Sequence, residues 1–241
     1  MKNIWPRPRL EGGFFSDIEP IRDGDQFAPQ GAIPTAVLHQ TSQNYMPPDV
    51  CLEARGVRGQ AYLPGDAFPA AYVEFDVLEK KPDSSIDDQR FFEACDAVNG
   101  TLSSLADAIL QASVEEIGSV LALGPILHLS RLEVRSDHAG QGLGVGLGTA
   151  MLRLLSQRYR AAMLVLKPFP LQFESCAPSP EAPDHVDFTE AFNLAEKRLA
   201  EFYCDSFGVR RVREGDTFML APLGSLELVV DEIGWSLHKI G

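Results

Sequence analysis

Residues 132–144 read LEVRSDHAGQGLG, and this stretch carries the strongest fold signal in the chain. An apolar, strand-like segment ends at Val134, a short polar turn follows, and glycines then recur at every second position before a helix. Such a turn presents backbone N–H groups at a helix N-terminus, where the helix dipole also favours negative charge. Glycine suits the turn because a side chain would hold a phosphate away from the backbone. The stretch therefore predicts a site for a phosphate or pyrophosphate.

Two other phosphate motifs are excluded by their spacing. A P-loop requires a lysine after its second glycine, and no lysine lies between Arg135 and Thr149. A dinucleotide fingerprint requires glycines at positions i, i+2 and i+5. Counted from the four glycines at 140, 142, 144 and 146, the last position is never glycine but is Val145, Leu147, Thr149 or Met151.

The stretch resembles the coenzyme A loop of the GNAT superfamily, the acetyl-CoA-dependent N-acyltransferases. That family reads roughly Leu-x-Val-x-x-x-x-Arg/Gln-x-x-Gly-x-Gly/Ala at the end of its fourth strand. Leu132, Val134, Gly142 and Gly144 match in register, whereas Ala139 stands at the Arg/Gln position. The family uses that position largely through its backbone N–H, so alanine is compatible with binding. The resemblance implies that acetyl-CoA, as cosubstrate, binds at Leu132, Val134, Ala139, Gly140, Gln141, Gly142, Leu143, Gly144 and Val145.

A second motif strengthens the resemblance. Residues 199–209, LAEFYCDSFGV, are similar to the family's last helix and following strand, which typically read Ala-x-x-(aromatic/Leu)-Tyr-x-x-x-Gly-Phe. Tyr203 precedes Gly208 by five residues where the family has four, and Glu196 stands where the family often has Asn. The resemblance covers residues 124–223, and residues 1–123 match the family only loosely.

The resemblance implies an α/β (α+β) fold with a GNAT-like, mostly antiparallel central sheet. Helices would flank this sheet, and its fourth and fifth strands would splay apart. We expect one GNAT-like domain over residues 1–241. Its parts would be an irregular arm (1–34), a helical insertion (82–123), an acetyl-CoA-binding core (124–223) and a C-terminal tail (224–241).

The pattern of apolar residues locates the elements. Period-two alternation and turn signals predict strands over 35–40, 50–62, 70–79, 125–134 and 161–167, and a hairpin of 209–212 with 217–223. Helical periodicity predicts helices within 82–123, after the loop at 139–145, and over 188–207. Ser85 and Ser113, each followed three residues later by an acidic residue, resemble N-terminal caps.

Composition limits the partners. A formal charge of −13 disfavours nucleic acid and is compatible with a cationic amine. Apolar runs fall short of the roughly 20 residues that span a bilayer, so no membrane partner is expected. The first residues, 1–7, lack a signal-peptide core, which favours a cytoplasmic protein. The four cysteines and five histidines are scattered, so no metal is expected. The expected acceptor is a small-molecule or peptide amine. The sequence does not decide between a monomer and a homodimer.

Acetyl transfer to an amine requires removal of a proton from the amine and stabilisation of the departing thiolate. His128 lies six residues before Val134, where some members of the family carry a catalytic His. Strict alternation would place it on one strand face with Ser130 and Leu132, and Glu133, the alternative base, on the other face. Tyr203 resembles the family's tyrosine that protonates the thiolate. Backbone N–H groups near Leu132 and Val134 would polarise the thioester carbonyl.

The function expected from the resemblance is acetyl-CoA-dependent N-acetyl transfer to an unidentified amine by direct attack. The alternative is a catalytically weak or inactive GNAT-fold module that serves binding or interaction. The departures at Ala139, at Glu196 and in the spacing after Tyr203 favour the alternative, whereas the preserved Gly142 and Gly144 favour the enzyme. A hydrolase lacks support because the chain has no Gly-x-Ser-x-Gly elbow.

Overall fold

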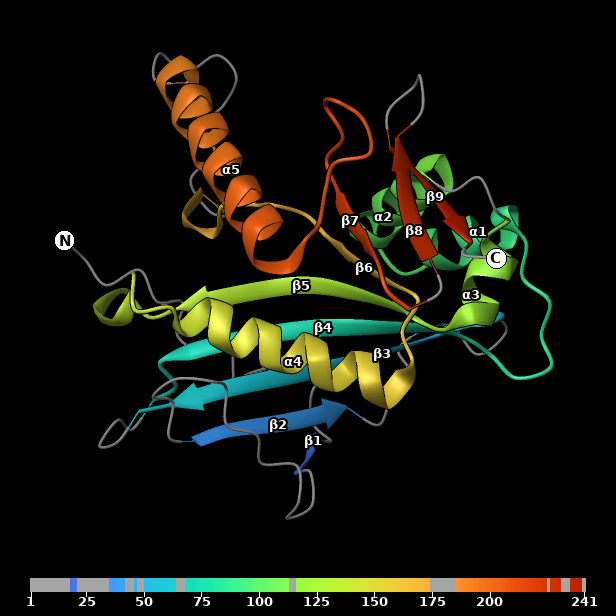
Figure 1. The fold of residues 1–241 in the computed structure, drawn as a ribbon, viewed down its shortest axis with the longest axis horizontal. Helices are drawn as coiled ribbons and strands as arrows, with labels where there is room; N and C mark the ends of the chain where they lie inside the picture. The colour runs from blue at the N-terminus through green and yellow to red at the C-terminus, as the bar shows by residue number, and fades with distance from the viewer. Residues whose placement is uncertain are drawn as a thin grey trace.

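The computed structural model describes residues 18–20, 35–41, 46, 50–63, 68–112, 116–173, 185–224, 226–230 and 235–239. Seven strands form one open sheet in which spatial order follows chain order (Figure 1). All neighbouring strands of this sheet pair antiparallel except β5 and β6, which are parallel. The strands are β1 (Ile18–Pro20), β2 (Thr35–Thr41), β3 (Leu52–Tyr62), β4 (Ala71–Lys80), β5 (Ile126–Val134), β6 (Met163–Leu166) and β7 (Met219–Pro222).

Five α-helices accompany the sheet, so the expected α/β class with a mostly antiparallel sheet is confirmed. One of them makes the crossover that the parallel pair β5–β6 requires. None of the described helices is both long enough and apolar enough to cross a bilayer. The helices are α1 (Asp88–Asp96), α2 (Gly100–Ala112), α3 (Ile117–Leu123), α4 (Leu143–Tyr159) and α5 (His185–Phe207), with short 3-10 turns η1 (Ser136–His138) and η2 (Leu171–Phe173).

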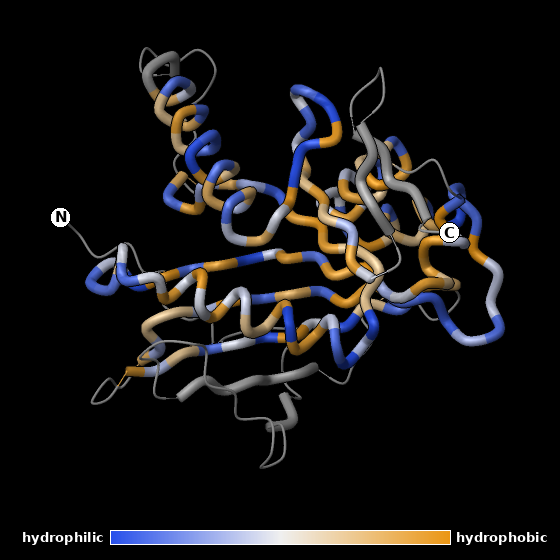
Figure 2. Tube along the Cα trace, viewed as in Figure 1, coloured by the Kyte–Doolittle hydropathy of each residue, from blue (hydrophilic) through white to orange (hydrophobic). Residues whose placement is uncertain are grey.

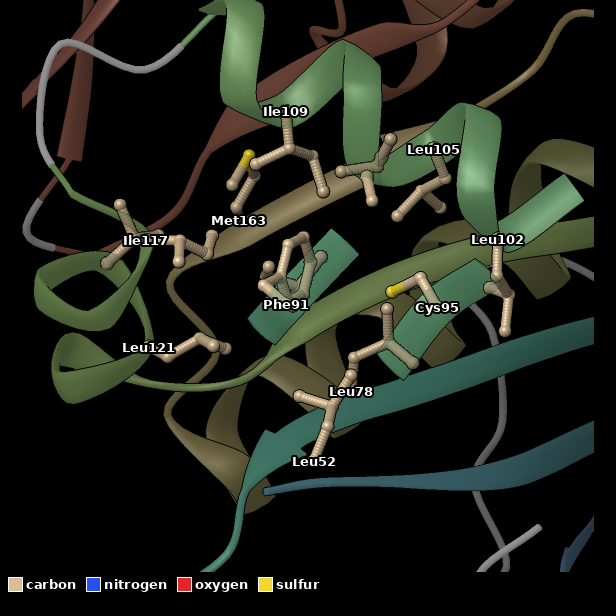
Figure 3. Close-up of a cluster of buried hydrophobic side chains, with 14 of the residues drawn as sticks. Leu52, Leu78, Phe91, Cys95, Leu102, Leu105, Ile109, Ile117, Leu121 and Met163 are labelled. Atoms are coloured by element: carbon tan, nitrogen blue, oxygen red, sulfur yellow. The ribbon is translucent and has the colours of Figure 1, made fainter. Parts of the chain in front are cut away.

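The two faces of the sheet are covered by different helices (Figure 1). Helix α4 lies along the middle of the sheet and buries an apolar surface that includes Val57, Phe75 and Leu129. Helices α1–α3 gather at one end of the other face and enclose Leu52, Leu78 and Met163 together with Phe91, Ile109 and Ile117 (Figure 3). The remainder of that second face is polar and only partly buried, and hydrophilic and hydrophobic residues alternate along β4 and β5 (Figure 2).

Helices α1–α3 lie between β4 and β5, within the residues where helical periodicity predicts them, but their caps differ from the prediction. Asp87, not Ser85, is the N-cap of α1, and its Oδ1 accepts from the backbone N–H of Arg90 at 2.8 Å. Ser113 lies outside the described residues. The first N–H of α3, at Ile117, donates to Asp88 Oδ1 at 2.9 Å, so the start of α1 holds the start of α3.

The hairpin expected of 209–212 with 217–223 needs correction. Val209 and Val212 are both buried, a spacing of three that does not suit a strand, and the predicted hairpin reduces to β7 with one bridge between Arg210 and Leu220. The tail forms a two-stranded hairpin of β8 (Leu226–Val230) and β9 (Trp235–Lys239). Within the predicted irregular arm, β1 pairs with β2, and the rest of the arm lies outside the described residues.

Glycine at position 118 sets how closely α3 approaches the chain before α1. A Cβ there would lie 2.5 Å from the backbone oxygen of Ile86, whereas a Cβ at Gly100, at the start of α2, would meet nothing within 4 Å. Gly118→Ala should therefore lower the free energy of unfolding by about 1–3 kcal/mol. Gly100→Ala should leave it unchanged or raise it slightly, because alanine reduces the entropy of the unfolded chain. Urea denaturation of both variants measures this, and equal stabilities would contradict the close approach.

Candidate functional site

A β-bulge in β5 determines the geometry of the site. Phe75 of β4 pairs with Leu129, but the next residue of β4, Glu74, pairs with Arg131, so Ser130 is an extra residue in β5. The pairing of β5 with β6 also stops at this point, after Leu129 pairs with Leu166. Bulges bend a strand and end its pairing. Within the described chain, residues 131–134 therefore have a strand partner on one side only.

The bulge reverses the alternation of side chains that the sequence predicts. His128 pairs with Asp76 and Glu133 pairs with Tyr72, and these partners lie four residues apart on the same face of β4. Glu133 thus shares its face with His128, which corrects the expectation that it points to the other side. Leu132 and Val134 pack instead against the apolar cluster under α4, so the expectation that Leu132 shares the face of His128 is also wrong.

The glycine loop after β5 has the backbone geometry that an anion site requires. Gly140 and Gly142 both have φ of +76°, a left-handed conformation, and added Cβ atoms at either would meet nothing within 4 Å. Gly142 is the N-cap of α4 and has no side chain that could cap the helix. The first backbone hydrogen bond of the helix runs from the Gly146 N–H to the Gly142 carbonyl. The three preceding N–H groups, from Leu143 to Val145, have no partner within the helix.

Gly144 has a different role from its neighbours in the motif. A Cβ there would lie 3.0 Å from Val134 Cγ2 and 3.9 Å from Leu132 Cδ2. The glycine therefore brings the first turn of α4 directly onto the end of β5. This contact fixes the helix N-terminus relative to the strand edge that the bulge leaves without a partner.

Ion pairs hold the turn between β5 and the glycines. The Arg135 guanidinium donates to Asp137 Oδ1 at 2.7 Å and to the Phe68 carbonyl at 3.2 Å, and it also contacts His138. The hydrogen bond from Arg135 lowers the pKa of the Asp137 carboxyl, although this side chain is exposed. The exposed loop residues Ala139, Gly140 and Gln141 follow directly, so the turn is anchored just before the backbone opens to solvent.

His128 forms a pair with Asp76 that sequence reasoning missed. Its Nδ1 lies 3.0 Å from Asp76 Oδ2, and the histidine is 4% exposed. A carboxylate accepts hydrogen bonds, so Nδ1 carries the proton in this pair and Nε2 is left as the acceptor in the neutral ring. The only sequence signal was the placement of Asp76 on the polar face of an alternating strand, and the register that joins it to His128 is a property of the fold.

A cleft of about 380 Å³ opens where β5 and β6 separate. Its lining combines apolar and aromatic side chains, two cations and several hydroxyl groups. The lining residues are Gly100, Thr101, Ser104, His128, Leu129, Ser130, Arg131, Leu132, Lys167, Phe169, Leu171, Tyr203 and Phe218. The structure therefore brings together His128, Leu132 and Tyr203, three of the residues predicted from sequence, across more than 70 positions of the chain.

Helix α5 places Tyr203 in this cleft. The Tyr203 ring lies 5.4 Å from that of Phe202 and stacks at 5.8 Å on that of Phe207. Nearer the N-terminus of α5, Phe188 and Phe192 contact Phe173 of η2 edge to face. Burial raises the pKa of the Tyr203 hydroxyl to about 12, so the phenol is protonated at neutral pH.

Glu133 is not among the cleft residues, and its side chain pairs with Arg131. Sequence reasoning also missed Lys167, Phe169 and Phe218, which come to the cleft from segments with no motif of their own. In the described part of the chain, no three His, Cys, Asp or Glu side chains gather where they could hold a metal ion. Comparison with protein-family models finds no match, and no curated protein matches the sequence significantly.

The raised pKa of Tyr203 gives a testable titration. We expect the tyrosinate absorbance of the wild type minus that of Tyr203→Phe to show one phenol ionising near pH 12, not near the ordinary value of about 10. The folded state favours the protonated phenol, so this contribution to stability is complete below pH 10 and is lost as the pH rises toward 12. Between pH 10 and pH 12, the free energy of unfolding of Tyr203→Phe should therefore fall less than that of the wild type. Tyr159→Phe, outside the cleft, is the control, and a difference curve centred near pH 10 would contradict the burial.

Proposed function

We propose that this protein is an acetyl-CoA-dependent N-acyltransferase with a GNAT-like architecture, which transfers an acetyl group directly to an amine. One observation carries the proposal. The strand β5 loses its partner β6 at a cleft lined by His128, which is hydrogen-bonded to Asp76, and by a buried tyrosine, and the same strand leads into a glycine loop at a helix N-terminus. Acyl transfer from CoA needs a reaction site and a pyrophosphate site at the two ends of one extended binding surface, and the cleft and the glycine loop occupy these positions along β5.

The free edge of β5 suits the extended arm of CoA. From His128 to Val134 the strand runs about 20 Å at its usual rise per residue. Beyond Leu129, its backbone groups on the side of β6 have no strand partner in the described chain, so they can pair with the amide groups of the arm. The pyrophosphate would then reach the loop from Ala139 to Val145, where N–H groups and the helix dipole favour an anion.

In the proposed reaction, the amine nitrogen attacks the thioester carbonyl carbon, and the C–S bond then breaks. His128 Nε2 accepts the proton that the amine loses, and Asp76 stabilises the imidazolium that forms. A backbone N–H of β5 near Leu132 donates to the developing oxyanion. Asp76 is thus a positioning residue, and His128 is the catalytic base.

Tyr203 is the proposed donor to the departing sulfur. A phenol with its pKa raised to about 12 is fully protonated at neutral pH, but it is a weaker acid than a thiol. Its contribution is therefore a hydrogen bond to the thiolate, while the proton taken by His128 balances the overall charge. Glu133, the alternative base, is a weaker candidate because it pairs with Arg131 and lies outside the cleft lining.

The binding or interaction module remains the second candidate, and Ala139 favours it. In this position, the family's Arg or Gln side chain would contribute a contact that alanine lacks. The two proposals differ in whether acetyl-CoA binds and whether any amine is acetylated, so the same two assays separate them.

The first assay tests the loop with a matched pair of glycine variants. Gly142→Trp should abolish acetyl-CoA binding in calorimetry, because the indole would occupy the space over the helix N-terminus. Gly215, in the turn before β7, also has positive φ and open space around it, so Gly215→Trp carries a comparable backbone strain. This control should bind like the wild type. Equal affinities for both variants would remove the loop from the binding site.

The second assay tests the His–Asp pair by turnover. His128→Ala should lower kcat/KM about a hundredfold, the lower end of a general-base contribution, and should flatten the acidic limb of the pH–rate profile. Asp76→Asn should lower kcat while leaving the KM for acetyl-CoA unchanged. Asp107→Asn, an exposed carboxylate on α2, is the control. Full activity of His128→Ala would assign the base elsewhere, and no turnover of any amine by the wild type would favour the binding module.

A further inference from the structure

We infer that the acceptor is a small amine carrying a carboxylate next to its amino group, as in an α-amino acid, and that Lys167 binds this carboxylate. The inference rests on the proposed function, because it assigns the amino group to His128. It concerns the charge of the cleft, which differs in sign from that of the chain.

The charged residues that line the cleft are cations. Arg131 and Lys167 belong to the lining, and none of the described residues that line it is Asp or Glu. The chain as a whole carries a formal charge of −13. Asp76 lies behind His128 in a hydrogen bond, so its carboxylate is already engaged. A simple ammonium would find no countercharge among the described lining residues. An amine that also carries a carboxylate could pair that carboxylate with a cation of the lining.

Lys167 is the cation available for that carboxylate. Arg131 pairs with Glu133, but in the described residues no carboxylate lies within ion-pair distance of Lys167, and its Nζ is held 5.8 Å from the centre of the Phe169 ring. The lysine is exposed, so binding an anion would not require a buried charge. Contact with Phe169 orients the side chain without neutralising it.

The register of β5 and β6 places Lys167 near the base. His128 pairs with Val165, and Lys167 follows two residues later, opposite the bulge at Ser130. Two residues of strand correspond to about 7 Å. A flexible lysine side chain can cover such a span, so one small molecule can contact Lys167 and His128 together.

The lining also provides room for an apolar side chain. Leu129, Leu171 and the rings of Phe169 and Phe218 surround the polar groups. The probes are therefore L-leucine, L-leucinamide and 3-methylbutylamine, which share the amino group and the side chain and differ only in the carboxylate. With acetyl-CoA, L-leucine should be acetylated with a kcat/KM at least tenfold above that of either other probe, since a hydrogen bond to a charged group contributes about this much.

Variants of Lys167 assign the preference to this residue. Lys167→Ala should raise the KM for L-leucine about tenfold and leave the KM for acetyl-CoA and the turnover of 3-methylbutylamine unchanged. Lys167→Arg should retain most of the preference. Lys197→Ala, an exposed lysine of α5 outside the cleft lining, is the control and should behave like the wild type. A kcat/KM for L-leucinamide or 3-methylbutylamine equal to or above that for L-leucine would overturn the inference and leave the acyltransferase proposal intact. A Lys167→Ala variant that changes only the KM for acetyl-CoA would also overturn the inference.

Binding separates this inference from the proposed function if no amine is acetylated. In calorimetry, N-acetyl-L-leucine should bind the wild type more tightly than N-acetyl-L-leucinamide, and Lys167→Ala should remove the difference. That result would support the carboxylate site even if turnover failed. Equal binding of the two probes would overturn it.

Discussion

β5 pairs with β6 only from Ile126 to Leu129, and the bulge at Ser130 then shifts its register against β4. In the described part of the chain, the backbone beyond this point has one neighbouring strand, β4, and no strand partner on its other edge. The cleft opens at the same residue, because the chain after β6 turns away at Pro168. Both the proposed surface for the CoA arm and the position of the proposed catalytic groups follow from this break in pairing.

The second face of the sheet changes character along its length, and the His–Asp pair lies at the boundary. Helices α1–α3 cover the apolar end, where Leu78 and Ile126 pair. The next row of that face holds Asp76 and His128, and beyond it Glu74 pairs with Arg58 at 2.9 Å. The histidine is thus buried by the edge of the helical layer on one side and borders the cleft on the other. Such a position buries the histidine, keeps Asp76 partly exposed and leaves room for a ligand.

Electrostatics within the cleft differ from those of the whole chain. The net charge of −13 describes the average surface, and by itself it is compatible with a cationic acceptor. Among the described residues, the cleft lining instead carries Arg131 and Lys167 without a carboxylate. Local charge decides recognition, because interactions at contact distance are screened far less than those across the protein surface.

The sequence by itself located strands β2–β6, the helical segments and the glycine loop, but it missed β1 and the β8–β9 hairpin and predicted a strand over 209–212 that does not form. Each depends on local patterns: period-two alternation in β4, helical periodicity in α2 and α5, and glycines at 140 and 142 where φ is positive. Only the tertiary structure decided which side chains meet. The bulge at Ser130 has no local signature, yet it moves Glu133 to the face of His128 and Leu132 away from it. The register that joins Asp76 to His128, and the packing that brings Tyr203 and Lys167 to one cleft, arise from contacts between distant segments, which a one-dimensional pattern does not encode.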